Sequence, residues 1–376
     1  MKIAIDLHGL GGAGTGLTRY AHGLLSHWLA DSRHEYRIFA PAAHRSCYAD
    51  IPRGGHARWH WAGAWSERAL TDLAWHHSAF PLTLSDCDVL FTAVDRRLPA
   101  WSPVPVVGTV HDLAPFAMAE KYGASRDTFN RRVLPSLMRR ADRLIAVSQA
   151  TADDLIRHLG LGADRVSVVP NGIEVARFAT CPAGATDAVR QRLGLTRPFA
   201  LYPGRLEHPG KNHVGAIAAA VAAGVDLVCV GRPWMQVEVI RAAAATHPGR
   251  IHLIGWLPDE DLVALYHAAV ALLFTSRHEG FGLPVLEAFA AGLPVICSQV
   301  AALVEVAGDA ALTAHPEDVA GFAGHLSRLL SEPQAAIDLI AKGRRRVAEF
   351  SWARAAADTL AVIERTGLSR RCAATR

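Results

Sequence analysis

Short apolar runs rich in β-branched residues recur along the chain and alternate with longer stretches of helical periodicity. The runs cover 2–7, 36–40, 88–93, 104–110, 144–148 and 166–170 in the first half, and 199–203, 227–231, 251–255, 271–276, 295–298 and 311–314 in the second. Continuous apolar strands that alternate with helices are typical of parallel sheets buried on both faces. The pattern therefore predicts an α/β protein with about six strands on each side, enough for two doubly wound sheets.

The composition changes over 171–198, where a turn and a short charged helix replace the apolar runs. This change indicates a connection between two domains. The expected segments are an N-terminal domain over 1–175, a linker over 176–197, a C-terminal domain over 198–350, and a final helix with its tail over 351–376. Ser351 suits the N-cap of that helix. Two similar α/β domains imply a cleft between them, the usual place for a ligand.

The chain has 376 residues, of which 51% are hydrophobic and 20% charged, as in a folded protein. Its net charge of +4 is spread along the sequence without a dominant basic block. Nucleic-acid-binding proteins usually gather basic residues on one face, so we expect no nucleic acid partner. An arginine-rich stretch over 126–143 is compatible with anionic headgroups of the inner membrane, but a solvated helix face is the simpler explanation.

The six cysteines are scattered, and none lies in a CxxC motif, which is typical of free thiols in a reducing compartment. Asp6 and His8 interrupt the apolar N-terminal run, which argues against a signal peptide. No apolar stretch is long enough to cross a bilayer, so we expect a cytoplasmic protein. The sequence has no HExxH or two-His-carboxylate motif, so we expect neither a metal nor a cofactor.

The segment RHEGFGLPVLEAFAAGLP over 277–294 carries the strongest chemical signal. It begins at the C-terminal end of a predicted strand, where open α/β sheets bind ligands. Pro284 suits the first turn of the next helix, and the free N–H groups of that turn suit a diphosphate. Glu279 in the loop and Glu287 in the helix can both face the cleft and accept hydrogen bonds from sugar hydroxyls. Isolated glutamates would merely be solvated; the surrounding glycines, proline and strand favour a binding site.

A second segment, YPGRLEHPGKN over 202–212, follows another apolar run. Arg205 and Lys211 can converge on one anionic group, and fixed cations there lower the barrier to departure of a diphosphate. Either residue alone would commonly be an ordinary surface charge. The acidic segment downstream makes the functional explanation the stronger one.

Two segments of the first half are further candidates. His111 follows an apolar run and can hydrogen-bond a ligand at the strand edge, although with 19 histidines in the chain such a placement arises easily by chance. The opening loop matches G-x-G-x-x-G at Gly9, Gly11 and Gly14, the fingerprint of dinucleotide-binding enzymes. The run over 36–40 ends without the acidic residue that would bind a ribose, so a nicotinamide oxidoreductase is a distant alternative.

The segments of the second half resemble the signatures of family 4 glycosyltransferases. Glu279 and Glu287, with seven residues between them, resemble the E-x7-E motif, and Arg205 with Lys211 resembles the G-R…K-N segment. The resemblance covers nearly the whole chain. It implies the GT-B fold, in which two Rossmann-like domains face a cleft and the last helix crosses back to the first domain. It also implies a metal-independent, retaining transfer of a hexose from a nucleotide sugar.

The same resemblance implies roles for single residues. Arg205 and Lys211 would stabilise the departing diphosphate, and His111 would position the sugar from the first domain. Glu279 would hold the sugar hydroxyls and Glu287 the nucleotide ribose. The catalytic candidates are therefore His111, Glu279, Arg205 and Lys211. The donor-binding candidates are Gly16, Arg205, Lys211, Glu279, Gly280, Phe281, Gly282, Leu283 and Glu287.

The opening loop resembles the G-x-G-R-Y loop of mannosyltransferase-like members, with Thr18 in place of the second glycine. Gly16 would then lie near the donor phosphates. Arg19 and Tyr20 would begin the helix on the acceptor side, although a plain helix surface explains them nearly as well.

The opening loop and the segment HPGKNH resemble those of bacterial mannosyl- and rhamnosyltransferases that build surface polysaccharide. GDP-mannose is therefore the expected donor, and a glycan or lipid-linked oligosaccharide the expected acceptor. The alternatives are a nucleotide-sugar 2-epimerase of the same fold and a catalytically silent binding or scaffold subunit. Silent relatives usually lose part of the set that binds the anion, whereas this chain retains Arg205, Lys211, Glu279 and Glu287.

Overall fold

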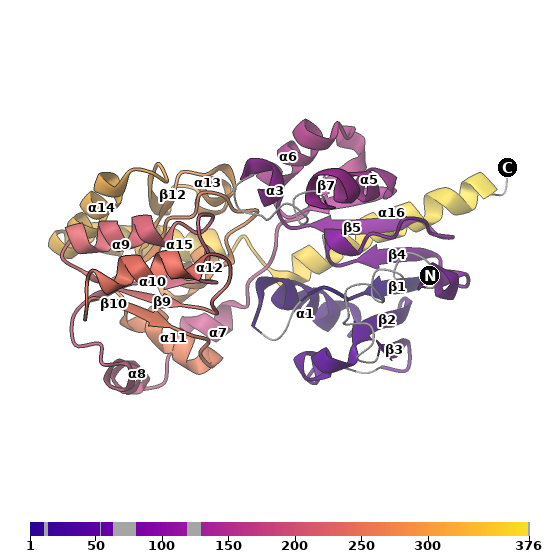
Figure 1. Ribbon diagram of the computed structural model, residues 1–376. Coiled ribbons are helices and arrows are strands. Elements are labelled where there is room, and N and C mark those ends of the chain that lie inside the picture. The colour runs from indigo at the N-terminus through magenta and orange to yellow at the C-terminus, as the bar shows by residue number, and fades with distance from the viewer. Residues whose placement is uncertain (11–13, 53, 63–79, 119–128, 375–376) are drawn as a thin grey trace. The chain divides into compact units, whose positions relative to one another are not determined.

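The computed structural model describes residues 1–10, 14–52, 54–62, 80–118 and 129–374 (Figure 1). The chain divides into two compact units. The first contains Met1–Phe116, the chain that leads up to Gly172, and the last helix from Ser351 onward. The second consists mainly of Ile173–Phe350. Each unit is built on its own parallel sheet.

The first unit contains a seven-stranded sheet whose neighbouring strands all run parallel. Its strands are β1 (Lys2–Asp6), β2 (Glu35–Pro41), β3 (Ala57–Ala62), β4 (Val89–Thr92), β5 (Val106–Val110), β6 (Arg143–Ala146) and β7 (Val166–Val168). Their spatial order is β3-β2-β1-β4-β5-β6-β7.

The helices of the first unit cover both faces of this sheet (Figure 1). They are α1 (Gly16–Trp28), α3 (Ala114–Ala117), α5 (Leu134–Arg140), α6 (Gln149–Leu159) and α16 (Trp352–Ala374), with 3₁₀ turns at Ala42–Tyr48, Phe80–Leu84, Asp95–Arg97 and Ala163–Arg165 and a π-helical turn at Phe129–Val133. Hydroxyl caps start two of them. Thr15 accepts the N–H of Thr18 at 3.2 Å before α1, and Ser148 accepts the N–H of Thr151 at 3.0 Å before α6.

The second unit contains a six-stranded parallel sheet of order β10-β9-β8-β11-β12-β13. Its strands are β8 (Phe199–Pro203), β9 (Asp226–Val230), β10 (Ile251–Ile254), β11 (Ala271–Phe274), β12 (Val295–Ser298) and β13 (Ala311–Ala314). Its helices are α7 (Val175–Ala179), α8 (Ala185–Leu193), α9 (His213–Ala222), α10 (Val237–Ala245), α11 (Asp259–Ala268), α12 (Leu283–Ala291), α13 (Ala301–Ala307), α14 (Val319–Ser331) and α15 (Pro333–Val347). Residues 176–197, where the sequence predicted a linker, form most of α7 and α8, which pack on α12 and α11.

Each apolar run predicted from the sequence overlaps a strand, so the prediction of two doubly wound parallel sheets is confirmed. The sequence pattern missed β3. This strand lies at the edge of its sheet and alternates exposed Arg58 and His60 with half-buried Trp59 and Trp61. An edge strand with one solvent-exposed face does not have the continuous apolar sequence that is typical of a central parallel strand.

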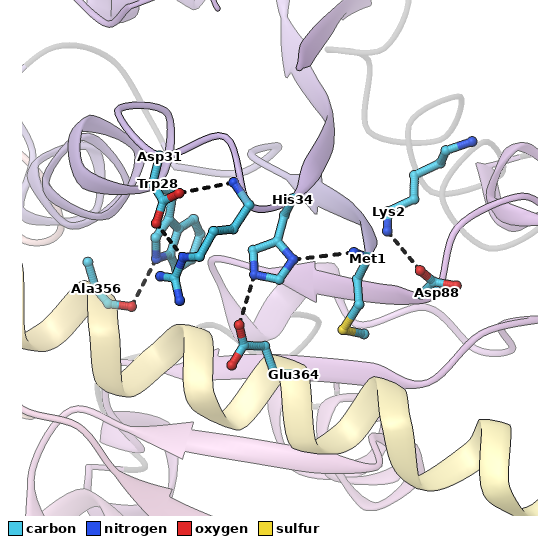
Figure 2. A network of polar contacts seen from close by, with 9 residues as sticks. Met1, Lys2, Trp28, Asp31, His34, Asp88, Ala356 and Glu364 are labelled. Carbon is cyan, nitrogen blue, oxygen red and sulfur yellow. Dashed lines mark hydrogen bonds and ion pairs between the residues drawn. The ribbon is translucent and has the colours of Figure 1, made fainter.

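The last helix, α16, is fixed on the first unit by polar bonds and by packing on α1 (Figure 2). The indole N–H of Trp28 donates to the carbonyl of Ala356 at 2.9 Å. His34 Nε2 lies 2.8 Å from the Glu364 carboxylate, and His34 Nδ1 faces the amino group of Met1 at 3.4 Å. The helix thus completes the core of the unit in which the chain begins. Of the helices in the described ranges, none is apolar over enough residues to cross a membrane.

Candidate functional site

The order of the second sheet reverses between β8 and β11, because the chain moves outward to β9 and β10 before it returns. In open α/β sheets, ligands bind outside the carboxyl ends of the strands at such a reversal. The loop over 204–212 follows β8, and the loop over 275–282 follows β11. The Arg277 N–H donates to the Gly210 carbonyl at 2.9 Å, so the two loops are bonded to each other. The two segments predicted from the sequence therefore meet at one edge of one sheet.

Lys211 and Glu279 come together at this edge. Lys211 Nζ lies 2.6 Å from Glu279 Oε1, and the two side chains are only 19% and 12% exposed. The ammonium also lies 5.6 Å from the ring centroid of Phe274, at the end of β11. A cation of the first loop and a carboxylate of the second thus form one ion pair shielded from water on most sides.

Tyr202 fixes the backbone that carries Lys211. Its side chain is fully buried near the end of β8 and stacks on His213 with the ring centroids 4.3 Å apart. Its hydroxyl donates to the Lys211 carbonyl and lies 3.0 Å from Ser276 Oγ in the second loop. Burial raises the pKa of Tyr202 well above its usual range, so the hydroxyl stays a neutral donor. Sequence reasoning missed this residue, because a tyrosine in an apolar run looks like any other core side chain.

Arg205 is held by a different set of groups. Its guanidinium lies 5.1 Å from the ring centroid of Trp234 and 3.9 Å from the Glu207 carboxylate. The segment around Leu206 pairs with the chain after β9, where the Trp234 N–H donates to the Leu206 carbonyl at 2.9 Å. The Arg205 side chain is 55% exposed and stays accessible to an anion. The convergence of Arg205 and Lys211 on one anion stays a prediction.

The loop after β11 ends at the N-terminus of α12. Gly282 has a φ of 111°, in the region that only glycine adopts without strain, and Leu283 is the first helical residue. The predicted position of Pro284 in the first turn is confirmed. Phe281 is buried edge-on against Phe350, with centroids 5.9 Å apart, and anchors the loop. In this first turn the Val285 N–H donates to the Gly282 carbonyl at 3.0 Å, and Pro284 has no N–H, so what suits an anion here is mainly the positive end of the helix dipole.

Glu287 lies one turn into α12 and is almost completely buried. The Tyr266 hydroxyl donates to its carboxylate at 2.6 Å and orients it. The chain also passes very close to itself at the neighbouring strand end, where a Cβ on Gly231 would collide with the carbonyl oxygen of Gly204. These contacts make the edge of the second sheet a rigid frame.

His111 lies at the corresponding edge of the first sheet, directly after β5. Its Nε2 lies 2.8 Å from the carbonyl oxygen of Ala93, which can only accept, so Nε2 carries the proton. Burial lowers the pKa of His111, which keeps the ring neutral. The other nitrogen, Nδ1, is therefore an acceptor. Asp112 accepts the N–H of Ala114 at 2.9 Å and orders the loop backbone.

Tyr20 supports His111 from α1. It is 1% exposed, its ring meets His111 edge-on with centroids 4.8 Å apart, and its hydroxyl lies 2.9 Å from Thr109 Oγ1. A surface position is therefore wrong for Tyr20, because the core of the first unit encloses it. Gly16 is the first residue of α1, whereas Gly11 lies outside the described residues. The roles of Gly16, Arg19 and Tyr20 toward donor or acceptor stay predictions.

A buried acid–histidine pair at the end of β1 was not expected as part of this edge. His8 Nδ1 lies 2.6 Å from Asp6 Oδ1, and both side chains are almost fully buried. The sequence did carry a signal, because these two polar residues interrupt an otherwise apolar run.

Two family models match this chain and together cover most of it. The model of Glycosyltransferase Family 4 matches residues 14–177, and the model described as Glycosyl transferases group 1 matches residues 186–346.

Relatives in sequence include the O-antigen chain mannosyltransferase B of Escherichia coli, 30% identical over 262 residues, which are 68% of this chain and 68% of that one. The glycogen synthase of Mycobacterium tuberculosis is 30% identical over 310 residues, which are 80% of this chain and 72% of that one.

Similar solved structures include Anabaena HepE in complex with UDP and glucose, with a TM-score of 0.77 and 19% identity over 97% of this chain and 99% of that chain. Sucrose-phosphate synthase from Thermosynechococcus elongatus has a TM-score of 0.75 and 22% identity over the full length of both chains. With the two parallel sheets, these neighbours confirm the predicted GT-B fold.

Proposed function

This chain belongs to the family 4, group 1 glycosyltransferases, and on that premise we propose that it transfers a hexose from a nucleotide sugar with retention of anomeric configuration and without a metal ion. One observation carries the proposal. A cation that suits a diphosphate and a carboxylate that suits sugar hydroxyls lie 2.6 Å apart, as Lys211 and Glu279, at the reversal of the second sheet. A nucleotide sugar carries a diphosphate and sugar hydroxyls at adjacent positions.

The reaction breaks the bond between the anomeric carbon and the diphosphate oxygen. Negative charge grows on the diphosphate as that bond lengthens, and Lys211, Arg205 and the first turn of α12 would stabilise it. The acceptor hydroxyl would attack the oxocarbenium-like sugar on the face from which the diphosphate leaves, and it would give its proton to the departing diphosphate. Fixed cations of the protein would thus supply the positive charge that a metal ion supplies in other enzymes.

The carboxylates would bind the neutral parts of the donor. Glu279 would accept hydrogen bonds from the sugar hydroxyls, and Glu287, oriented by Tyr266, would accept them from the ribose. His111 would accept a hydrogen bond from a substrate hydroxyl through its unprotonated Nδ1. The proposed roles divide the site into a part that binds charge and a part that binds hydroxyls.

We propose mannose as the sugar, GDP-mannose as the donor, and a glycan or lipid-linked oligosaccharide as the acceptor. The support is the likeness to a mannosyltransferase named for an O-antigen chain. The free thiols of the described Cys87, Cys229 and Cys297 fit the reducing cytoplasm that we propose as its location. Two arginines of α5, Arg139 and Arg140, donate to backbone carbonyls of the first unit, which supports an ordinary helix face there over a lipid contact.

A thermal-shift screen without metal tests the donor site. Purified protein is heated with GDP, UDP, ADP, dTDP, their sugars or NAD, and we expect one nucleoside diphosphate and its sugar to raise Tm by a few degrees at high excess. Lys211→Ala and Arg205→Ala should abolish the shift. Lys342→Ala, which removes a surface cation paired with Asp309 at 2.9 Å, is the matched control. A folded wild type that responds to none of these nucleotides contradicts the proposal.

A product assay tests the chemistry. With the nucleotide sugar that gives a shift, EDTA present and a mannose-containing oligosaccharide as acceptor, NMR of the product should show the anomeric configuration of the donor. Inversion, or activity that EDTA abolishes and a metal restores, would refute the corresponding half of the proposal. Conversion of the donor to its C2 epimer without any acceptor would identify the chain as an epimerase instead.

A further inference from the structure

The ion pair between Lys211 and Glu279 makes the binding of phosphate depend on the carboxylate. The two charges lie 2.6 Å apart and largely out of water. Each of them has lost much of its hydration, so each relies on the other for compensation. A phosphate that takes over the Lys211 ammonium must leave the Glu279 carboxylate with some other partner.

The backbone that carries Lys211 is anchored beside Glu279. Its backbone is held by the Tyr202 hydroxyl, and the next residue is held by Thr275, whose hydroxyl donates to the Asn212 carbonyl at 2.9 Å. Its ammonium already lies over the ring of Phe274. An anion bound by Lys211 therefore comes close to the Glu279 carboxylate, and two negative charges at that distance repel each other strongly in a partly desolvated site.

The two ligands that meet this site during turnover differ in what they offer Glu279. A nucleotide sugar brings hydroxyl groups, which donate hydrogen bonds to the carboxylate and compensate it. A free nucleoside diphosphate brings no sugar, and its terminal phosphate carries an additional ionisable oxygen. The carboxylate is thus satisfied by the donor and repelled by the product.

Taking the proposed donor site as given, we propose that Glu279 determines specificity for the sugar-bearing nucleotide over the sugar-free one. Its carboxylate holds Lys211 in the empty site, exchanges that cation for sugar hydroxyls when the donor binds, and disfavours the nucleoside diphosphate that remains after transfer. The same residue thus favours entry of the donor and release of the product.

This role predicts the direction in which each dissociation constant changes when Glu279 is neutralised, and a merely structural role would predict otherwise. If Glu279 only held Lys211 in place, its removal would weaken the binding of both nucleotides. If it competes with phosphate for Lys211, its neutralisation must tighten the binding of the nucleoside diphosphate while it weakens that of the sugar donor. The two dissociation constants must therefore move in opposite directions.

The test is calorimetric titration of the full chain with GDP and GDP-mannose, and with UDP and UDP-glucose as a second pair of probes. In Glu279→Gln, which keeps the shape and removes the charge, the nucleoside diphosphate should bind about threefold to tenfold more tightly and the sugar donor at least as much more weakly. Glu279→Ala should give the same two signs. The Tm of each variant shows that it is folded.

Glu317→Gln is the matched control. Glu317 carries an equal charge and pairs at 2.7 Å with Arg277, which lies in the same loop as Glu279, but the Glu317 side chain is 59% exposed. Its neutralisation should change both dissociation constants by less than about twofold. If both Glu279 variants weaken the nucleoside diphosphate, or if Glu317→Gln tightens it equally, the discrimination by Glu279 is refuted while the donor site stands. If the wild type binds neither pair of probes, the donor site itself is refuted and this inference with it.

Discussion

The two sheets reverse their strand order at equivalent places, between β1 and β4 in the first unit and between β8 and β11 in the second. At the second reversal, Lys211 and Glu279 form an ion pair with part of each side chain open to solvent. Near the first, His111 is kept neutral by burial and donates to the carbonyl of Ala93, the residue after β4. The same topology therefore carries an ion pair at the edge of one unit and a neutral histidine at the edge of the other.

The difference shows what each edge can bind. At the first edge, burial together with the nearby charge of Asp112 raises the pKa of Asp95 to about 6, and Tyr20 fills the core beside His111. An environment that disfavours charge suits neutral hydroxyl groups. The second edge supplies cations and the first turn of a helix, as an anion requires. Topology fixes where a site lies, and a few side chains decide what it binds.

The sharpest way to break this comparison is to remove the charge from the second edge. Lys211→Ala removes the cation that pairs with Glu279, and kcat/KM should fall about a hundredfold to a thousandfold because the departing diphosphate loses a fixed cation. Steady-state kinetics with the sugar donor measure the loss, and Lys342→Ala should leave the rate unchanged. Less than a fivefold loss would mean that Lys211 is not part of the reaction centre.

The neutral edge is tested next, with a smaller expected effect. His111→Phe keeps a ring in this half-buried place but removes both ring nitrogens, the Nδ1 acceptor among them, and kcat/KM should fall about tenfold to a hundredfold. His111→Gln, which offers a carbonyl acceptor, should recover part of the loss. Because burial lowers the pKa of His111, the imidazole stays an acceptor as the pH falls below its ordinary value. An activity that halves near pH 6.5 in the wild type but not in His111→Gln would contradict a neutral His111.

The charged edge was more visible in the sequence than the neutral one, for a physical reason. Arg205, Lys211 and Glu279 are charged residues among glycines that follow apolar runs, at the strand ends where open α/β sheets bind ligands. Tyr202 and Tyr20 act from within the core, where their spacing is that of ordinary packing residues. Only the structure shows which backbone group a buried hydroxyl reaches.

The strand predictions succeeded and failed for a related reason. Central parallel strands such as β8 and β11 are buried on both faces, so their sequences are continuously apolar. The edge strand β3 presents Arg58 and His60 to water and lost that signal. The pairing of Lys211 with Glu279 also needed the structure, because 68 positions separate the two residues and only the reversal of the sheet brings them together.

Acid should destabilise the protein through the buried imidazole of His213. His213 is completely buried against Tyr202, and burial lowers its pKa to about 3. In the unfolded chain the imidazole titrates near 6.5, so the unfolded state takes up the proton first as the pH falls. The contribution of the neutral His213 to the free energy of unfolding is therefore fully present above pH 6.5 and is lost as the pH falls toward 3. At pH 5 the free energy of unfolding is lower by about 2 kcal/mol.

Urea unfolding at pH 7.5 and pH 5 measures this difference in the wild type and in His213→Phe, which keeps a ring on Tyr202 but does not titrate. The free energy of unfolding should depend less on pH in the variant by about that amount. His22, which is half-buried beside the exposed Asp50 at 3.0 Å, provides the control position. An equal pH dependence in wild type and His213→Phe would show that the buried ring of the second unit does not govern its acid stability.

The smallest expected effect compares the same chemical change in the two units. Tyr202→Phe removes one hydroxyl from the charged edge, leaves the Lys211 carbonyl without its donor and frees the loop that carries the ammonium. We expect kcat to fall about fivefold to tenfold with KM nearly unchanged, because the cation is misplaced chiefly where charge develops in the transition state. Tyr48→Phe removes an equally buried hydroxyl from the first unit, and within the described part of the chain that hydroxyl has no hydrogen-bond partner. It should change neither kcat nor stability, whereas Tyr202→Phe should also lower the free energy of unfolding by about 1 kcal/mol.

If the two variants lose stability equally and neither changes kcat, Tyr202 only fills the core. A loss of kcat confined to Tyr202→Phe would instead show that the charged edge depends on a neutral, buried donor behind it, the kind of group that the first unit places beside His111.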